Sequence, residues 1–449
     1  MNIFQLNRVI YCISFVGILL VSSCSKHIKT PDDTKYLEEF HLVNFEPKEK
    51  SLDENSLRLY VDYSTCTKLG QNSVFFQALE PTFTQLTTNY YSIKGGIIKE
   101  EDIQDSSVYL RLRNIDEVNY AELRVAAEQI ASGNSEAVFL TDGEYFTQNT
   151  AKGHENDPWL TDALKKWILK GHDIHILSEP YVEAGFSKKR FYILFTDDRN
   201  SNNVYERILR TVDLTQFPDV DEFHISASHP QIKGNGNNCS TQNDYLLSKS
   251  KGYGTFEIED WDGCDWKTIE DQLVNAYDDE TGEPLERGAT IIQMGLDKNS
   301  FGCYRIKSIN LNVYDINQEY YDYYSSRADG GKPAPIDFQK NEIENFFEID
   351  NTEFEKHSSI NISFKKDWFD PSVLTGRPYN YLKVDLSINE VQSIFDQHED
   401  KFEFESISNI GSKNVSVASS IKQCLADDDV LNMMHNQVIY SIYIKSEAK

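Results

Sequence analysis

The chain is poor in positive charge. Its 449 residues include 44 Lys or Arg and 72 Asp or Glu, which gives a formal net charge of −28 at pH 7. Contacts from Lys and Arg to phosphate supply most of the affinity of proteins for nucleic acid, and a strongly negative field repels anionic surfaces. No basic cluster compensates for this deficit. We therefore expect no nucleic-acid partner.

Several ligand-binding signatures are also missing. The glycines of residues 234–236 are not followed by the Lys-Ser/Thr of a phosphate-binding loop. Acidic runs at 219–222, 278–280 and 427–429 lack the alternating oxygen ligands of a calcium loop, which favours solvated loops or helix ends. No internal repeat is apparent.

Cysteine is scarce, with seven residues in the chain. Cys12 and Cys24 lie near the N-terminus, and Cys66 stands alone in the next 200 residues. In an oxidising compartment the remaining four allow two disulfides with three possible pairings, and the alternative is free buried thiols. These four are Cys239, Cys264, Cys303 and Cys424.

The N-terminus carries an apolar run, residues 9–21, that is too short and too weakly flanked for a permanent membrane span. The run ends in Val-Ser-Ser-Cys at Cys24, which resembles the lipobox of bacterial lipoproteins. The resemblance implies that residues 1–23 are a signal peptide and that Cys24 is acylated. The chain would then be anchored through lipid to the cell membrane or the outer membrane on the exported side. The alternative is an uncleaved signal anchor.

Composition divides the rest of the chain into a tether and two domains. Residues 24–55 are rich in Lys, Asp, Glu and Pro, which favours a solvated tether. The length of the chain predicts two domains, and we place them at 56–216 and 223–449.

The first domain alternates strand-like and helix-like segments. We expect a Rossmann-like, mostly parallel sheet with helices on both faces, because strands and helices of this length alternate along the chain. Asp157 is expected to cap the third helix. The strands are expected at 57–62, 89–93, 107–112, 137–142, 173–177 and 190–195, and the helices at 72–86, 120–131, 157–169 and 204–212.

The second domain is strand-rich, and we expect a sandwich-like or mixed α+β module of no recognised family. Its tyrosine cluster at residues 319–324 (EYYDYY) predicts either a stacking surface or rings divided between core and surface. The strands are expected at 254–258, 289–294, 304–313, 359–364, 379–387, 402–407 and 437–444, and the helices at 266–277, 388–397 and 417–425.

Two strand-like segments of the first domain end in acid. Residues 57–66 read LRLYVDYSTC and residues 137–146 read AVFLTDGEYF, so each apolar run stops at an aspartate. This is the pattern of a buried parallel strand that presents a carboxylate at its C-terminal end. Ligands of open α/β sheets bind in the crevice beyond those ends. We therefore expect Asp62 and Asp142 to face one crevice.

These segments resemble the metal-ion-dependent adhesion site of the von Willebrand factor A domain, with its Asp-x-Ser-x-Ser loop and Thr-Asp-Gly turn. The resemblance implies a metal held by Asp62, Ser64 and Asp142, with Mg²⁺ as the first choice and Ca²⁺ or Mn²⁺ as alternatives. Two positions depart from the family. Cys66 replaces the second serine and is a poor ligand for a hard cation, and the segment at 116–119 offers no separate threonine ligand.

The expected function is that of a lipid-anchored cell-envelope protein that binds a protein or other ligand at the C-terminal face of its strands. A metal-dependent hydrolase is the alternative, because acids at strand ends also build such sites. A hydrolase predicts that Glu179 or Asp197 lies within metal-bridging reach of Asp62 and Asp142. The haloacid-type arrangement is disfavoured, because Ser64 occupies the position of its second aspartate.

The histidines give weaker signals. His172 and His175 are three residues apart on an expected strand, which points their rings to opposite faces and argues against a shared metal. His224 lies near the expected domain junction and is interpreted as structural or exposed.

Overall fold

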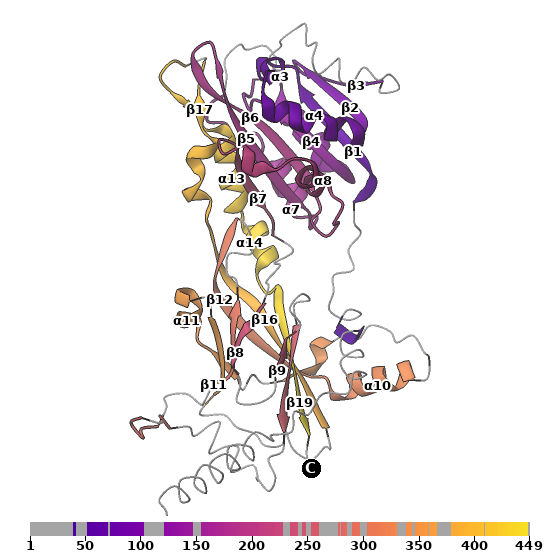
Figure 1. The fold of residues 1–449 in the computed structure, drawn as a ribbon, viewed down its shortest axis with the longest axis vertical. Helices are drawn as coiled ribbons and strands as arrows, with labels where there is room; N and C mark the ends of the chain where they lie inside the picture. The colour runs from indigo at the N-terminus through magenta and orange to yellow at the C-terminus, as the bar shows by residue number, and fades with distance from the viewer. Residues whose placement is uncertain are drawn as a thin grey trace, which may run out of the picture.

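Two units, an α/β unit and a β-rich unit, are stacked along the long axis of the molecule (Figure 1). The structure is a computed structural model. It describes residues 39–41, 52–70, 72–102, 121–146, 154–227, 234–240, 245–247, 253–259, 277–278, 280–284, 290–296, 303–328, 330, 338–343, 345, 347–357, 359–365, 379–407 and 409–447. The expected signal peptide, Cys24, the expected strand at 107–112 and nearly all of the expected helix at 266–277 lie outside these residues.

The α/β unit is built on a seven-stranded mixed sheet with the order β3-β2-β1-β4-β6-β5-β7. β1 pairs in parallel with both β2 and β4, and all other neighbours are antiparallel. The sheet is therefore parallel only in its core. The strands are β1 Asp53–Asp62, β2 Thr87–Lys94, β3 Ile97–Glu101, β4 Ser135–Thr141, β5 Asp173–Glu183, β6 Phe186–Thr196 and β7 Asp221–Ile225.

A hairpin accounts for the antiparallel half of the sheet. The expected strand at 173–177 was to end just before Ser178 and Glu179. β5 instead continues to Glu183 and turns directly into β6. The turn residues Ala184 and Gly185 both have positive φ, +50° and +89°, as a type I′ turn requires. Since β6 runs opposite to β4, Asp197 lies at the other edge of the sheet from Asp62 and Asp142, that is, at the end where β1 and β4 begin. Asp197 is therefore not brought near Asp62 and Asp142, as the hydrolase alternative would require.

Helices cover both faces of this sheet, as the sequence predicted. Alternate residues of β1 enter different cores: Leu59 packs with α4 and α8, and Tyr60 packs with α6 and α7. The alternation follows from the two-residue period of a strand. The helices are α3 Thr65–Gly70, α4 Val74–Leu86, α6 Leu123–Ser132, α7 Thr161–Ile168 and α8 Val204–Thr211.

Polar side chains set two of the helix starts. Ser73 caps α4 by accepting from Phe76 N at 3.0 Å, and Asn203 caps α8 by accepting from Glu206 N at 2.8 Å. The expected cap of α7 at Asp157 is wrong. That helix begins three residues later than expected, and the Asp157 carboxylate instead pairs with Arg124 at 2.9 Å.

The β-rich unit contains a six-stranded sheet, β13-β12-β16-β19-β10-β9, and a four-stranded sheet, β14-β15-β11-β8. The expected helix at 388–397 is wrong. β16 continues to Ser393 because residues 388–393 remain paired with β12, and only a 3₁₀ turn follows. The strands are β8 Gly234–Ser240, β9 Tyr245–Leu247, β10 Tyr253–Glu259, β11 Thr290–Leu296, β12 Tyr304–Asp315, β13 Glu342–Ile343, β14 Phe347–Ile349, β15 Ser359–Phe364, β16 Tyr379–Ser393 and β19 Val438–Glu447.

Part of the expected tether is packed. Residues 39–41 are helical, and the buried Phe40 ring contacts Tyr320 and Tyr323 of α10 (Asn317–Ala328) edge to face. Tyr321 and Tyr324 of the same helix are exposed. The tyrosine cluster is thus divided between a small core and the surface.

The chain returns from the β-rich unit to cover the α/β unit. α13 (Ser416–Leu425) packs on α7, and Leu160 N donates to Ser420 Oγ at 3.1 Å. Phe402 packs on Phe191 of β6 with the ring centroids 6.4 Å apart. The segment also contains β17 Phe404–Glu405, β18 Lys413–Asn414 and α14 Asp428–Met434. The described residues of 395–425 therefore pack with the α/β unit, and α14 lies against α13 and β16, although the sequence assigned the whole segment to the second domain.

The described cysteines of the second half are buried free thiols. Cys303 and Cys424 form no disulfide, so for these two residues the free-thiol alternative is confirmed. Cys264 and the side chain of Cys239 lie outside what the structure describes.

One buried carboxyl group makes stability depend on pH. Glu136 of β4 is 2% exposed and accepts hydrogen bonds from Val204 N at 3.2 and 3.1 Å. Burial raises the pKa of Glu136, and the hydrogen bond from Val204 N lowers it. Burial is the larger effect, so the pKa is about 7. The folded state therefore holds a proton more tightly than the unfolded state, and the resulting stability is lost as pH rises from about 4.5 to about 7.

We expect Glu136→Gln to remove this loss, because the amide keeps an acceptor for Val204 N but cannot ionise. At pH 8 the variant should be more stable than the wild type by about 1–3 kcal/mol, and at pH 4 the two should be equal. Urea denaturation at both pH values measures this. Glu128→Gln, an exposed change on α6, is the control. A pH-independent gain in Glu136→Gln would contradict the explanation.

Candidate functional site at the carboxyl ends of β1 and β4

The structure brings Asp62 and Asp142 together at the point where the strand order reverses. The chain passes from β1 outward to β2 and β3, then returns to place β4 on the other side of β1. Asp62 ends β1, and Asp142 directly follows β4. The hydroxyl of Thr141 donates to Asp62 Oδ2 at 3.0 Å and joins the two strand ends. This is the position at which open α/β sheets bind ligands.

Short loops fix both carboxyl groups. In the second loop Gly143 N donates to Thr141 Oγ1 at 3.1 Å, and Glu144 N donates to Asp142 Oδ1 at 2.9 Å. Gly143 has a φ of +73°, which the turn requires and which glycine adopts without strain.

The first loop is held at two points. The Thr67 hydroxyl donates to the Asp62 carbonyl at 2.7 Å, and Arg190 Nε donates to the Cys66 carbonyl at 2.9 Å. Ser64 Oγ lies 3.0 Å from Cys66 Sγ.

The pair of carboxyl groups lacks compensation. Asp62 and Asp142 are 1% and 6% exposed. Burial, followed by the charge of Asp142, raises the pKa of Asp62 well above its usual range. Burial, followed by the charge of Glu144, raises the pKa of Asp142 to about 7. Asp62 Oδ1 is buried without a hydrogen bond to any described residue. The site therefore favours either a proton or a cation.

Cys66 is inert at this site. Burial, then the charges of Asp142 and Asp62, raises the pKa of its thiol well above the usual value. A neutral thiol is neither a good nucleophile nor a ligand for a hard cation. The Ser64 side chain lowers the pKa of both carboxyl groups, so two carboxylates and one hydroxyl remain as the oxygen donors.

The other two strand acids do not join this pair. The Glu179 carboxylate is bound by Arg190 Nη1 at 2.6 Å and by the Tyr192 hydroxyl at 2.8 Å. Glu179 and Arg190 line a separate pocket of about 500 Å³ that neither Asp62 nor Asp142 lines. Asp197 pairs with Arg199 at 2.7 Å at the opposite edge of the sheet. Within the described part of the chain, no third His, Cys, Asp or Glu side chain joins Asp62 and Asp142 in a metal-holding group.

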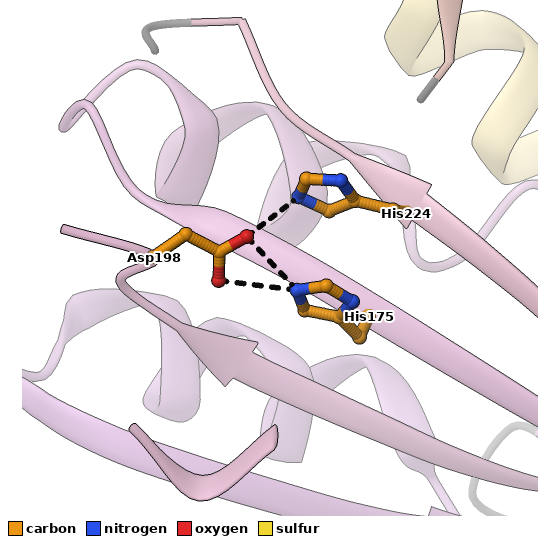
Figure 2. A group of neighbouring side chains, drawn as sticks. All are labelled: His175, Asp198 and His224. Carbon is orange, nitrogen blue, oxygen red and sulfur yellow. Dashed lines mark hydrogen bonds and ion pairs between the residues drawn. The ribbon is translucent and has the colours of Figure 1, made fainter. Parts of the chain in front are cut away.

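A second cluster, which the sequence did not reveal, lies at that opposite edge. It contains His175 of β5, His224 of β7 and Asp198 after β6 (Figure 2). His175 Nε2 lies 3.1 Å from both Asp198 oxygens, and His224 Nε2 lies 3.1 Å from Asp198 Oδ2. The β5–β7 register brings the two histidines together, because it places His175 directly opposite His224. Only a prediction of that strand pairing could have revealed the cluster. His172 points elsewhere and pairs with Asp197.

The carboxylates of the second cluster favour the charged form of His224. Burial lowers the pKa of His224, but the nearby carboxylates of Asp173 and Asp198 outweigh burial and raise that pKa to about 9. Burial raises the pKa of Asp198, but the neighbouring imidazoles of His175 and His224 hold it well below the usual range.

Comparisons with models of known protein families, with curated proteins and with solved structures find no match for this chain. None of the helices in the described ranges is long and apolar enough to cross a membrane. The functional argument therefore depends on the geometry of the two edges of the sheet.

Gly143 is expected to tolerate no side chain, because a Cβ would lie 2.7 Å from Val417 Cγ2 of α13 and 2.9 Å from Phe191 Cε2. Gly143→Ala should lower the free energy of unfolding by about 2–4 kcal/mol, from left-handed backbone strain and overpacking together. Urea denaturation followed by tryptophan fluorescence measures the change.

Gly185→Ala is the matched control. Its φ is also positive, +89°, but a Cβ there meets no atom within 4 Å. It should cost only the backbone strain, about 1–2 kcal/mol. Equal losses in the two variants would show that α13 does not restrict the Thr-Asp-Gly turn.

Proposed function

We propose that the protein is a lipid-anchored cell-envelope protein whose α/β unit binds a protein ligand through a divalent cation. Asp62, Ser64 and Asp142 would hold the ion, with Mg²⁺ as the first choice. The observation that carries the proposal is the meeting of two buried carboxyl groups at the strand reversal, with one carboxylate oxygen unpartnered.

The residues present suit a hard cation. Two carboxylates and a hydroxyl supply only oxygen, which Mg²⁺, Mn²⁺ and Ca²⁺ prefer. A cation would neutralise the charge that burial makes costly, and Asp62 Oδ1 has no competing hydrogen bond among the described residues. These features support the resemblance to the von Willebrand A-domain site, while Cys66 and the lack of a threonine at 116–119 leave it with two oxygen ligands fewer than the family motif.

The remaining side chains orient the donors. Thr141 holds Asp62 Oδ2 in place, and the backbone of Glu144 holds Asp142 Oδ1, so both carboxyl groups are positioned before a ligand arrives. The bound ion would supply an open coordination position for a carboxylate of the partner.

We favour binding over hydrolysis because neither of the two acids that a hydrolase would bring within metal-bridging reach, Glu179 and Asp197, joins the described pair. Glu179 is neutralised by Arg190, and Asp197 lies at the other edge. Hydrolytic sites of this kind use further ligands to position a second metal or an attacking water, and no further His, Cys, Asp or Glu of the described residues groups with Asp62 and Asp142 in a metal-holding set.

We expect calorimetry to detect Mg²⁺ binding by the purified wild-type chain and a loss of affinity of at least about tenfold in Asp62→Asn and Asp142→Asn. Each amide removes one negative charge and one strong ligand while it conserves shape. Asp162→Asn, an exposed change on α7, should bind like the wild type.

Two results would overturn the proposal. The first is no binding of Mg²⁺, Mn²⁺ or Ca²⁺ by the folded wild-type chain. The second is Mg²⁺-dependent cleavage of a chromogenic phosphate ester that is lost in Asp62→Asn, which would establish the hydrolase instead.

The membrane anchor is tested separately. If Cys24 is acylated after export, cells given radiolabelled palmitate should incorporate label into the wild-type chain, and Cys24→Ser should incorporate none. Label in Cys24→Ser, or its absence from the wild type, would remove the lipid anchor from the proposal without affecting the metal site.

A further inference from the structure

The hairpin and the edge strand point two histidines to the same face of the sheet. On β5, His175 alternates with Ile174 and Ile176, which enter the core shared with α7. On β7, His224 alternates with Phe223 and Ile225 of that same core. Both imidazoles therefore lie on the α8 face, where their rings stack with centroids 4.2 Å apart. Figure 2 shows both rings directed at the Asp198 carboxylate.

The separations suit ligands of one ion. In a tetrahedral site with metal–nitrogen bonds of about 2.0–2.1 Å, ligand atoms lie roughly 3.4 Å apart. The ligand atoms of His175, Asp198 and His224 all lie within 4.8 Å of one another, and each imidazole is 3.1 Å from the carboxylate. Modest rotation of the rings would bring all three atoms to bonding distance.

Two further carboxylates support these three residues. Glu222 Oε1 lies 3.6 Å from His175 Nδ1, the position from which a carboxylate orients a metal-bound imidazole. Asp173 is 1% exposed, and its Oδ1 has no hydrogen bond to the described residues although it lies 3.5 Å from His224 Nε2. A buried oxygen that accepts no hydrogen bond from a described residue is thus directed at the same place.

A path from solvent exists, because the side chains of His224 and Asp198 are 27% and 22% exposed, whereas His175 is only 5% exposed. The Tyr205 ring covers the other face of His175 with centroids 3.7 Å apart. The cluster is therefore shielded on the side of α8 and open on the side of His224.

We propose that His175, Asp198 and His224 bind a divalent transition-metal ion of the zinc type, with Asp173 Oδ1 or water as the fourth ligand. Imidazole nitrogen with one carboxylate favours Zn²⁺ over Mg²⁺, which prefers oxygen alone. This site is distinct from the carboxylate pair and is independent of the function proposed for it.

The ion would fasten β7 to the sheet. β7 is a five-residue edge strand that pairs only with β5 among the described strands. Ser226 follows it, with its N 3.4 Å from Cys303 Sγ at the start of β12. A metal bridging β5, β7 and the loop after β6 would hold the chain where it leaves the α/β unit.

The test uses the purified chain stripped with a chelator and then titrated with Zn²⁺ by calorimetry, and with Co²⁺ by visible absorption. We expect one equivalent of either metal, a tetrahedral Co²⁺ spectrum, and slower hydrogen exchange of the β7 amides with Zn²⁺. His175→Gln and His224→Gln should weaken Zn²⁺ binding at least about 100-fold. His172→Gln, a change of a buried histidine at the same end of β5 that pairs with Asp197 instead, should leave it unchanged.

Asp198→Asn provides a second test in case the histidine variants do not fold. It conserves the shape of the side chain and should also weaken Zn²⁺ binding. No Zn²⁺ binding by the wild type, or equal binding by His172→Gln and His224→Gln, would overturn the site and leave only an ion-paired cluster. Binding without slower exchange in β7 would overturn the fastening role. Mg²⁺ binding should persist in His224→Gln, and Zn²⁺ binding should persist in Asp62→Asn, so each site can fail without the other.

Discussion

The parallel pairing of β1 with β4 is the constraint on which the rest of the α/β unit depends. Its register sets Val61 beside Leu140, so both strands end together and the Thr141 hydroxyl reaches Asp62. A shift of one residue would turn Leu59 and Val61 out of one core and Tyr60 out of the other. The hydrophobic alternation of β1 therefore fixes the register, and the register in turn forces two acids into one buried place.

Much of this edge could be predicted from the sequence, because apolar runs ending in Asp62 and Asp142 carry a local signal. The helices at 74–86, 123–132 and 204–211 follow from apolar spacing in the same way. The opposite edge could not be predicted. Ala184-Gly185 is an unusual pair for a type I′ turn, which more often contains Asn-Gly, and without that turn the direction of β6 stays unknown. The meeting of His175 with His224 depends on a strand pairing between residues 49 positions apart, about which local patterns are silent.

The two edges of the sheet divide the available chemistry. At the carboxyl ends of β1 and β4, buried acids face one another with oxygen donors only. At the other end, imidazoles meet carboxylates that are already charged, as the lowered pKa of Asp198 indicates. A single sheet thus offers oxygen donors for a hard cation at one edge and imidazole nitrogens for a borderline, zinc-type cation at the other. The two sets are separate because antiparallel β6 carries its terminal acids away from those of β1 and β4.

The return of residues 395–434 has a mechanical consequence. The chain passes between the units after residue 41, after β7, after β16 and before β19, so at least four covalent connections link them. One connection would let the α/β unit swivel, whereas several separated connections resist torsion. Because α13 also packs on Gly143, a twist or pull on the six-stranded sheet reaches the turn that carries Asp142. Tension along β16 or β19 would then act directly on the orientation of that carboxylate.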